Sequence, residues 1–137
     1  IGLVYNVYYK DIIYISYLAI DDTKRGAGYG GRILQTIQKK YSDSRIFLCI
    51  EEMDPNAENY EQRVRRKAFY ESNGFKMLPF QVKEGIVMYD AMCVADREPE
   101  ITRKECDELM KHYFGIWTFV IYVKKYTDKI AGVFGGK

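Results

Sequence analysis

Hydrophobic positions along the chain follow two patterns, which predict the order of its strands and helices. Runs rich in valine, isoleucine and tyrosine predict strands at residues 2–9, 12–20, 45–51, 75–81 and 86–95, with a last strand at 116–123. Stretches in which apolar residues recur every three or four positions predict helices at 28–41, at about 59–73 and from 102 to a stop at 115. Strands and helices in this order indicate an α/β domain.

Short polar segments predict how the strands connect. The turn Lys10-Asp11 joins the first two strands into a hairpin, and a turn at residues 83–85 joins the strands at 75–81 and 86–95. Residues 12–51 read as strand, helix and strand, which is a βαβ unit. The run RIFLCIE at 45–51 has an apolar stretch at 46–50, as expected for a short central parallel strand buried on both faces.

The second helix has a predicted start, stop and two faces. Asp54 followed by Pro55 predicts the N-cap and the first helical position, and Gly74 predicts the stop. Helical spacing puts Tyr60, Val64 and Ala68 on the expected core side. The same spacing puts Asn59, Arg63, Arg66 and Tyr70 on another face. The basic run at 63–67 is either a solvated surface or a site for phosphate, and both interpretations stay open.

The third helix opens with the pattern Thr102-x-x-Glu105, which is a capping box. Its expected buried face consists of Cys106, Leu109, Met110 and Tyr113. A capping box and an apolar face together predict a stable helix that packs on the rest of the chain.

Composition and charge restrict the class of protein. The chain has 137 residues, 47% hydrophobic content and a net charge of +2, which indicate one globular domain without a nucleic-acid partner. No apolar run is long enough for a membrane span. Cys49, Cys93 and Cys106 lack metal-ligand spacing, so we expect reduced thiols in a cytoplasmic protein and no metal. The chain begins at Ile1 inside a predicted strand, and we expect that an N-terminal segment precedes it.

A glycine-rich turn between the second strand and the first helix is the main candidate for chemistry. Four glycines fall within residues 26–31, where the first amides of the helix lack intrahelical acceptors and attract phosphate. Gly26-x-Gly28-x-x-Gly31 matches the dinucleotide fingerprint, with Glu51 at the distance of a ribose-binding acid. However, residues 21–25 separate the strand from the first glycine, whereas the fingerprint requires the glycine directly after the strand.

Two other segments support a different interpretation of the same turn. Leu18-Ala19-Ile20, then Arg25-x-x-Gly28-x-Gly30, and further along Phe69-Tyr70-x-x-x-Gly74-Phe75 occur in this order. Together they resemble the two signatures of the GNAT superfamily of N-acetyltransferases. The resemblance covers residues 1 to about 95 and implies a mixed, largely antiparallel sheet with a central βαβ unit, namely family strands three to seven. The N-terminal elements of the family have no counterpart here.

The resemblance also implies which residues bind acetyl-CoA as co-substrate. They are Leu18, Ala19, Ile20, Arg25, Gly26, Ala27, Gly28, Tyr29, Gly30 and Gly31 around the turn, with Asn59, Arg63 and Arg66 on the second helix. Amides of residues 27–31 would hold the pyrophosphate, and the backbone of Leu18 and Ile20 would pair with the amide arm like an added strand.

Catalytic roles follow in part from the same resemblance. Tyr70 matches the tyrosine that in this family protonates the departing thiolate, and the family's oxyanion donor is a backbone amide in the segment 18–20. Many members carry a glutamate base where this chain has Tyr14, so that role does not carry over. Glu51, at the end of the central strand, is the best substitute, and Asp21, Glu52 or a water chain are alternatives.

The sequence therefore predicts an N-acetyltransferase that transfers an acetyl group from acetyl-CoA to a small-molecule or peptide amine. A CoA-binding module without turnover and a nucleotide-dependent oxidoreductase stay open as alternatives. Residues 1–95 form the expected acetyl-CoA-binding core, and residues 96–137 form a helix-and-strand extension packed on it. Trp117 and Phe119 in this extension need burial, so it either completes the sheet or builds a homodimer.

Overall fold

The computed structural model of the chain describes residues 2–20 and 26–113. Its helices and strands are β1 (Gly2–Tyr9), β2 (Ile12–Ile20), α1 (Tyr29–Lys40), β3 (Arg45–Glu51), α2 (Tyr60–Ser72), β4 (Phe75–Glu84) and β5 (Val87–Val94). Residues 103–113 are also helical. The expected strand at 116–123 and the aromatic residues in it lie outside the described residues, as do Asp21 and Arg25.

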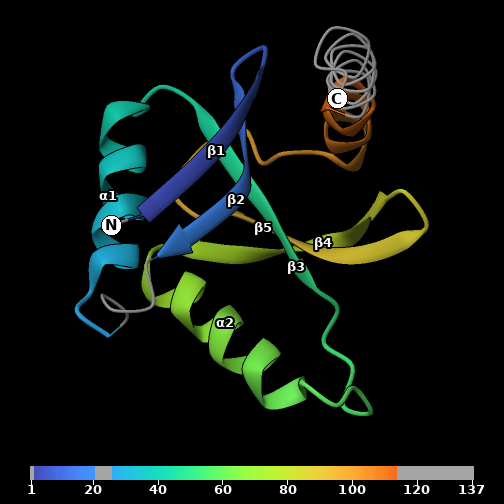
Figure 1. Cartoon of the computed structure of the whole chain (residues 1–137). Helices are drawn as coiled ribbons and strands as arrows, with labels where there is room; N and C mark the ends of the chain where they lie inside the picture. The colour runs from blue at the N-terminus through green and yellow to red at the C-terminus, as the bar shows by residue number, and fades with distance from the viewer. Residues whose placement is uncertain (1, 21–25, 114–137) are drawn as a thin grey trace, which may run out of the picture.

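The strands form one five-stranded sheet in the order β1-β2-β3-β5-β4. Only β2 and β3 are parallel, whereas the other neighbours are antiparallel. The mixed, largely antiparallel sheet with a central β2-α1-β3 unit is the predicted fold class, which is therefore confirmed. Figure 1 shows α1 and α2 near the strands that they connect, and the 103–113 helix in orange at the upper right.

The core consists of two clusters, one on each face of the sheet. Ile13, Ile15, Ile46 and Leu48 pack with α1 on one face, against which Phe69 of α2 also packs. The residues that alternate with them point to the opposite face, where Tyr14, Phe47, Ala91 and Cys93 pack against Cys106, Leu109, Met110 and Tyr113 of the 103–113 helix. We call these the α1–α2 face and the 103–113 face. Both faces of β2 and β3 are thus buried, as the apolar run in β3 predicts.

Two devices satisfy the carboxyl ends of α1 and α2. Gly74 follows α2 with a φ of 88°, which is the left-handed conformation expected at a helix stop. At the end of α1, the guanidinium of Arg97 donates hydrogen bonds to one carbonyl in the last turn of the helix and to three in the segment that follows it. The acceptors are the carbonyls of Gln38, Tyr41, Ser42 and Ser44.

The second helix differs from the prediction in its start and in its core side. It begins at Tyr60, because Asp54 instead accepts a hydrogen bond from the amide of Asn56 and forms a local turn. Val64 and Ala68 are exposed, so the predicted core side is wrong. Phe69 and Tyr70 supply the packing instead.

The hairpin between β4 and β5 is longer than predicted. Strand pairing continues to Glu84, opposite Val87, so that the turn consists of Gly85 and Ile86 alone. Gly85 has a φ of 63°, which a tight two-residue turn requires. Glu84 therefore belongs to a strand face and not to a loop.

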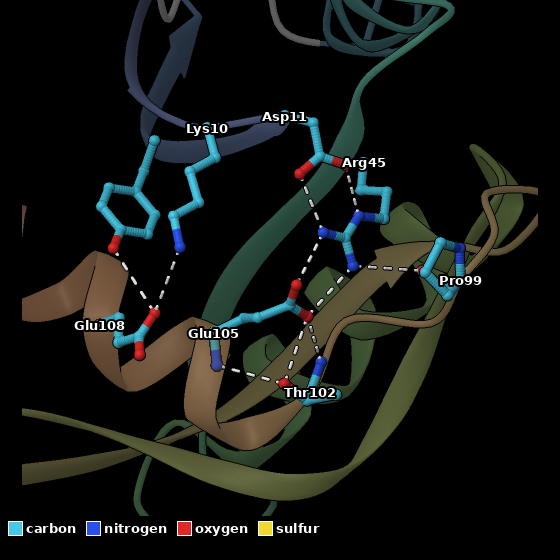
Figure 2. Close-up of polar contacts among 8 residues, drawn as sticks. Lys10, Asp11, Arg45, Pro99, Thr102, Glu105 and Glu108 are labelled. Carbon is cyan, nitrogen blue, oxygen red and sulfur yellow. Dashed lines mark hydrogen bonds and ion pairs between the residues drawn. The ribbon is translucent and has the colours of Figure 1, made fainter.

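A network of polar contacts attaches the 103–113 helix to the sheet (Figure 2). The capping box forms as predicted, because the amide of Thr102 donates to Glu105 and the amide of Glu105 donates to the Thr102 hydroxyl. Arg45, at the start of β3, bonds Asp11 and Glu105 at nitrogen–oxygen distances of 2.7 Å each. It also donates to the carbonyl of Pro99. Together with these polar contacts, the apolar face of residues 103–113 packs in the core cluster.

Candidate functional site

The two parallel strands separate before they end, which opens a wedge in the sheet. The last paired residues are Ile15 and Leu48, although β2 continues to Ile20 and β3 to Glu51. The register between β1 and β2 shifts at this point, so that β2 carries one extra residue, Ser16. A bulge of this kind increases the local twist and bends the strand. Figure 1 shows the carboxyl ends of β2 and β3 pointing apart.

Because of this separation, β2 has one edge in the wedge beyond residue 15. Its other edge still pairs with β1, where Leu18 faces Val4 and Ala19 faces Leu3. The predicted binding segment 18–20 thus lies on a strand whose wedge-side backbone groups take no part in the β2–β3 ladder. Such an edge is what an extended amide chain requires for pairing.

The glycine turn ends at the N-terminus of α1 in a shape suited to an anion. Gly28 caps the helix with a φ of 77°, and a Cβ placed there would meet no atom within 4 Å. The first helical hydrogen bond of the helix runs from the Arg32 amide to the Gly28 carbonyl, so the amides before it lack intrahelical acceptors. The first turn carries no acidic residue. The positive end of the helix dipole is therefore uncompensated at this point.

A glycine is required at Gly31 for a different structural reason than at Gly28. A Cβ on Gly31 would lie 2.9 Å from the side-chain oxygen of Asn73, which follows α2. Gln38, two turns further along α1, donates to the carbonyl of Asn73 at 2.8 Å. The third glycine of the dinucleotide-like pattern thus allows α1 and α2 to pack closely. This close packing explains the glycine without a bound ligand.

Three of the predicted binding residues on α2 meet the carboxylate of Glu51. Asn59 donates to Glu51 at 3.0 Å, Arg66 donates at 2.7 Å, and Arg63 lies 3.1 Å away. Arg63 also donates to the carbonyl of Glu52. The helical spacing therefore did predict residues that come together, on a face directed at the end of β3.

This arrangement changes the chemistry of Glu51. The hydrogen bond from Asn59 lowers its pKa most, and the charges of Arg63 and Arg66 lower it further. A carboxylate with a lowered pKa is a weaker proton acceptor than an ordinary one. The geometry therefore counts against the predicted role of Glu51 as general base.

Tyr70 lies one helical turn beyond Arg66, half-buried beside two phenylalanines. Its ring makes edge contacts with Phe69 and Phe75 at centroid distances of 5.2 and 5.8 Å. Burial raises the pKa of its phenol, although the charge of Arg66 opposes this rise. The hydroxyl is therefore protonated near neutral pH, which is the state in which it can donate a proton.

Tyr14 occupies the position where a base is expected, and the structure explains why it cannot serve as one. Its side chain is 3% exposed and stacks on Phe47 with ring centroids 4.8 Å apart. Burial raises its pKa far above the usual value. Tyr14 is thus part of the core on the 103–113 face.

The described residues contain a separate hollow of about 480 Å³ between β1 and α1. It is lined in part by Asn6, Tyr29, Arg32 and Lys40. At 100° per residue, the residues of α1 that line it are on the opposite side of the helix from Gly31. It therefore lies beside the glycine turn but outside the wedge.

Comparison with known proteins identifies the fold. No protein-family profile matches the sequence, and neither does any curated protein. Among solved structures, a protein from Bacteroides thetaiotaomicron described as a GNAT-family acetyltransferase superposes over 82% of this chain, with a TM-score of 0.59 and 24% identity. An aminoglycoside 6'-N-acetyltransferase complexed with coenzyme A superposes over 72% of the chain and 68% of its own length, with a TM-score of 0.51 and 16% identity.

The chain has the GNAT fold. It spans 62% of the length of the Bacteroides thetaiotaomicron protein. The interpretation of the glycines as a dinucleotide-binding fingerprint is not compatible with this fold, because that fingerprint belongs to a mostly parallel sheet, whereas among the described strands β2 and β3 form the one parallel pair. In the GNAT fold the wedge and the glycine turn belong to the same β2-α1-β3 unit.

One candidate residue was missed by the sequence reasoning. Glu84 lies at the end of β4, on the face where Val82 packs against the 103–113 helix, and burial raises its pKa. The signal that could have found it is the alternation along β4, where Leu78, Val82 and then Glu84 occupy every second position. We assigned Glu84 to a turn because Lys83, Glu84 and Gly85 are turn-forming residue types.

Residues 2–20 and 26–113 contain neither a membrane-spanning helix nor a cluster of metal ligands. None of the helices there has the length and apolar character needed to cross a membrane. The same residues contain no group of three histidine, cysteine, aspartate or glutamate side chains arranged to hold a metal ion.

Proposed function

We propose that this chain is an acetyl-CoA-dependent N-acetyltransferase that acts on a small-molecule or peptide amine. The observation that carries the proposal is the wedge between β2 and β3, followed by a glycine turn at the N-terminus of α1. An extended amide arm and a pyrophosphate need an open strand edge and a set of free amides, and these two features supply them. The aminoglycoside 6'-N-acetyltransferase with the same fold is described with coenzyme A bound.

In this proposal the backbone provides most of the contacts to acetyl-CoA. The wedge-side edge of β2 at Leu18, Ala19 and Ile20 pairs with the amide arm, and one of its amides stabilises the oxyanion. The amides from Ala27 to Gly31 hold the pyrophosphate, and Gly26 and Gly28 keep the approach free of side chains, since a Cβ at either would meet no atom within 4 Å. Arg25, which directly precedes Gly26 in the sequence, adds positive charge.

The residues at the start of α2 have a supporting role in the same proposal. Arg66 has a side chain that is 41% exposed, so it can contact a phosphate while it pairs with Glu51. Arg63 and Asn59 are held against the same carboxylate, which leaves them less free to do so. We therefore assign Arg66 to cofactor binding and Glu51 to the positioning of the α2 side chains.

Tyr70 supplies the proton for the leaving group. Acetyl-CoA, when bound, brings a thioester whose thiolate leaves as the amine attacks the carbonyl carbon directly. A phenol near pKa ~10 and a thiol near ~8.5 are close enough for efficient proton transfer. Because burial raises the pKa of Tyr70, the phenol stays protonated until it is needed.

A CoA-binding module without turnover is the second candidate, and one observation favours it. Tyr14 stands where many members of the family carry a base, and it is buried with a raised pKa. The pKa of Glu51 is lowered. Neither residue can therefore deprotonate an ammonium group effectively. Under this alternative the wedge binds acetyl-CoA, but no amine reacts.

One pair of experiments tests the proposal. Acetyl-CoA should raise the Tm of the protein, whereas NAD should not, and CoA release should be observed with at least one amine among spermidine, tobramycin and a peptide with an N-terminal alanine. Binding without CoA release on a broader amine panel would favour the module. Absence of acetyl-CoA binding would refute both candidates.

Gly28→Val provides the site-specific arm, with Gly85→Val as its matched control. Both glycines have a positive φ, 77° and 63°, and open space around the Cβ position, so valine strains both to a similar degree, of about 1–3 kcal/mol. Only Gly28 adjoins the proposed pyrophosphate site. We expect acetyl-CoA affinity to fall in Gly28→Val alone, and equal affinities in the two variants would move the cofactor elsewhere.

The cysteines bear on the compartment of the protein, and the segment beyond residue 95 bears on its oligomeric state. Cys49, Cys93 and Cys106 are free thiols, which suits a reducing compartment, and we propose the cytoplasm. A homodimer built through the segment beyond residue 95 stays part of the proposal, to be tested by the oligomeric state after truncation at Asp96.

A further inference from the structure

Glu84 is a charged residue in a position that the strand pattern assigns to the core. Leu78 and Val82 are buried on the 103–113 face, and Glu84 follows them in the same alternation along β4. Strand pairing extends through Glu84, so this alternation holds to the end of the strand. A carboxylate there is only partly accessible to water.

Glu84 also lacks a partner within residues 2–20 and 26–113. No hydrogen bond or ion pair of its carboxylate is found there, whereas Asp11, Glu51 and Glu105 are each bonded to an arginine. Those three carboxyls have lowered pKa values, and burial alone raises the pKa of Glu84. Burying a carboxylate without a partner costs free energy, which a bound cation would recover.

The position of Glu84 relates it to the wedge. Val82, two residues before Glu84 on the same face of β4, packs in the same cluster as Tyr14 and Cys49, and it pairs with Tyr89. Burial is the main cause that raises the pKa values of Tyr14, Cys49 and Tyr89, and the charge of Glu84 raises them further. Cys49 is the first residue of β3 after the last pair with β2, and therefore lies at the mouth of the wedge. Tyr89 pairs with Glu51 at the end of β3.

Glu84 and Tyr70 lie on opposite faces of the sheet. Tyr70 packs on the α1–α2 face, whereas Leu78 and Val82, which precede Glu84 on β4, pack on the 103–113 face. A thioester in the wedge would thus have a proton donor on one side and a free carboxylate on the other. An acceptor amine that enters from the 103–113 face would meet the carboxylate.

We propose that Glu84 binds the ammonium group of the acceptor on the 103–113 face and takes its proton, so that it is the general base of the reaction. This inference rests on the proposed acetyltransferase function. It also assigns the base that the resemblance left without a residue.

The protons and electrons of the reaction balance with these two side chains. Glu84 takes one proton from the ammonium group, whose nitrogen lone pair then forms the new N–C bond. The C–S bond breaks, and its electron pair leaves on the thiolate, which takes the proton of Tyr70. The second proton lost by the amide nitrogen restores Tyr70 through solvent, and Glu84 releases its own proton to solvent.

The charged surroundings set the direction of the pH dependence. The charge of Glu84 acts on Tyr14 from β2, Cys49 from β3 and Tyr89 from β5. Lys83 is adjacent in the sequence and lines a hollow together with Asp107 and Lys111 of the 103–113 helix. Glu51, at the end of β3, pairs with Tyr89. Glu84 must be deprotonated to act. The value of kcat/KM should therefore rise with pH through the pKa of Glu84, in a range above that of an exposed carboxyl.

Glu84→Gln tests the role, with Glu84→Asp and Asp107→Asn as controls. With the amine that gives turnover in the wild type, Glu84→Gln should lower kcat/KM by about 10²–10⁴-fold and should remove the acid limb of the rate profile. Its affinity for acetyl-CoA should stay at the wild-type value. Glu84→Asp should keep the acid limb at a reduced rate. Asp107→Asn removes an exposed carboxylate from the neighbouring helix and should keep both the rate and the limb.

The remaining outcomes each decide the proposal. An unchanged rate and acid limb in Glu84→Gln would overturn it, and so would an equal loss of Tm and acetyl-CoA affinity, since this indicates a structural role. If the wild type binds acetyl-CoA but turns over none of the amines, the acetyltransferase function fails separately. Calorimetry would then compare spermidine binding by the wild type and by Glu84→Gln. Loss of binding in the variant supports an ammonium site at Glu84, and equal binding refutes it.

Discussion

Replacement of Arg45 by methionine should destabilise the fold by removing the junction between β3, the β1–β2 turn and the 103–113 helix (Figure 2). The guanidinium makes two hydrogen bonds to Asp11, at 2.7 and 2.9 Å, and two to Glu105, at 3.1 and 2.7 Å. Methionine fills much of the same volume but leaves both carboxylates without their cation.

The magnitude follows from the exposure of the groups involved. Removing one partner of a fully buried ion pair costs about 3–5 kcal/mol. The Arg45 side chain is 9% exposed, but those of Asp11 and Glu105 are 52% and 31% exposed and regain water when the arginine is lost. We therefore expect a loss of about 2 kcal/mol, equivalent to a fall in Tm of roughly 6–10 °C for a chain of this size.

The matched control is Lys76→Met, which removes an ion pair of similar length from the surface. Lys76 and Glu100 lie 2.6 Å apart, with side chains that are 42% and 44% exposed. Surface pairs of this kind contribute about 0–1 kcal/mol. Urea denaturation should therefore separate the two variants, and equal losses in Arg45→Met and Lys76→Met would refute the reasoning.

The pH dependence of the difference gives a second readout. Arg45 lowers the pKa values of Asp11 and Glu105 in the folded protein. Their contribution is fully present above the ordinary carboxyl pKa of about 4 and is lost as the pH falls through the lowered folded values. The stability difference between wild type and Arg45→Met should therefore be constant near neutral pH and should shrink in acid. A difference that grows in acid would contradict this assignment.

Three further changes have definite expected outcomes. Tyr70→Phe should lower kcat by about 10²–10⁴-fold with little change in acetyl-CoA affinity or Tm. Assays of CoA release would measure the rate, and calorimetry would measure the affinity and the Tm. A full rate would exclude Tyr70 as the acid. Gly31→Ala should change the free energy of unfolding little, because a gain of about 1 kcal/mol in helix propensity offsets the close contact with Asn73, whereas Gly31→Leu should lower the Tm clearly. Arg97→Ala should destabilise the protein by about 1–3 kcal/mol in urea, because carbonyls at the end of α1 lose their donor, and a loss no greater than that in Lys76→Met would contradict this.

The sequence predicted most of the fold because its local signals agree with the long-range structure. Residues 2–9, 12–20 and 45–51 are strands with the predicted bounds, and Gly74 ends α2 in the predicted conformation. The capping box at Thr102 also forms. Each of these features depends on neighbours within a few positions, which a sequence displays directly.

The errors on α2 have a physical explanation in the weak amphipathicity of that helix. None of its residues is fully buried, and its apolar side chains do not occupy a single side. Periodicity alone therefore could not decide between the side with Val64 and Ala68 and the side with Phe69 and Tyr70. The side with Phe69 and Tyr70 faces the core because Tyr70 contacts Phe75. That contact depends on how β4 folds back along the sheet.

A sequence can indicate the parts of the candidate site that depend on one segment, but not the parts that depend on several. The glycine turn and the Asn59–Arg63–Arg66 face follow from spacing along one helix each. Glu51 was recognised as a strand-end carboxylate, but its lowered pKa depends on side chains 8 to 15 positions away. A local pattern cannot show whether a carboxylate faces a cation, and that decides whether it can act as a base.

Arg45 and Glu84 show how the surroundings of a charged core residue separate structure from function. Both occupy positions at which the strand pattern expects an apolar side chain. Arg45 has two carboxylates and a carbonyl as partners, so its charge is compensated within the fold. Glu84 has no such partner in the described part of the chain, and burial therefore raises its pKa. Under the proposed function, an acceptor ammonium group would supply the positive charge that compensates this carboxylate.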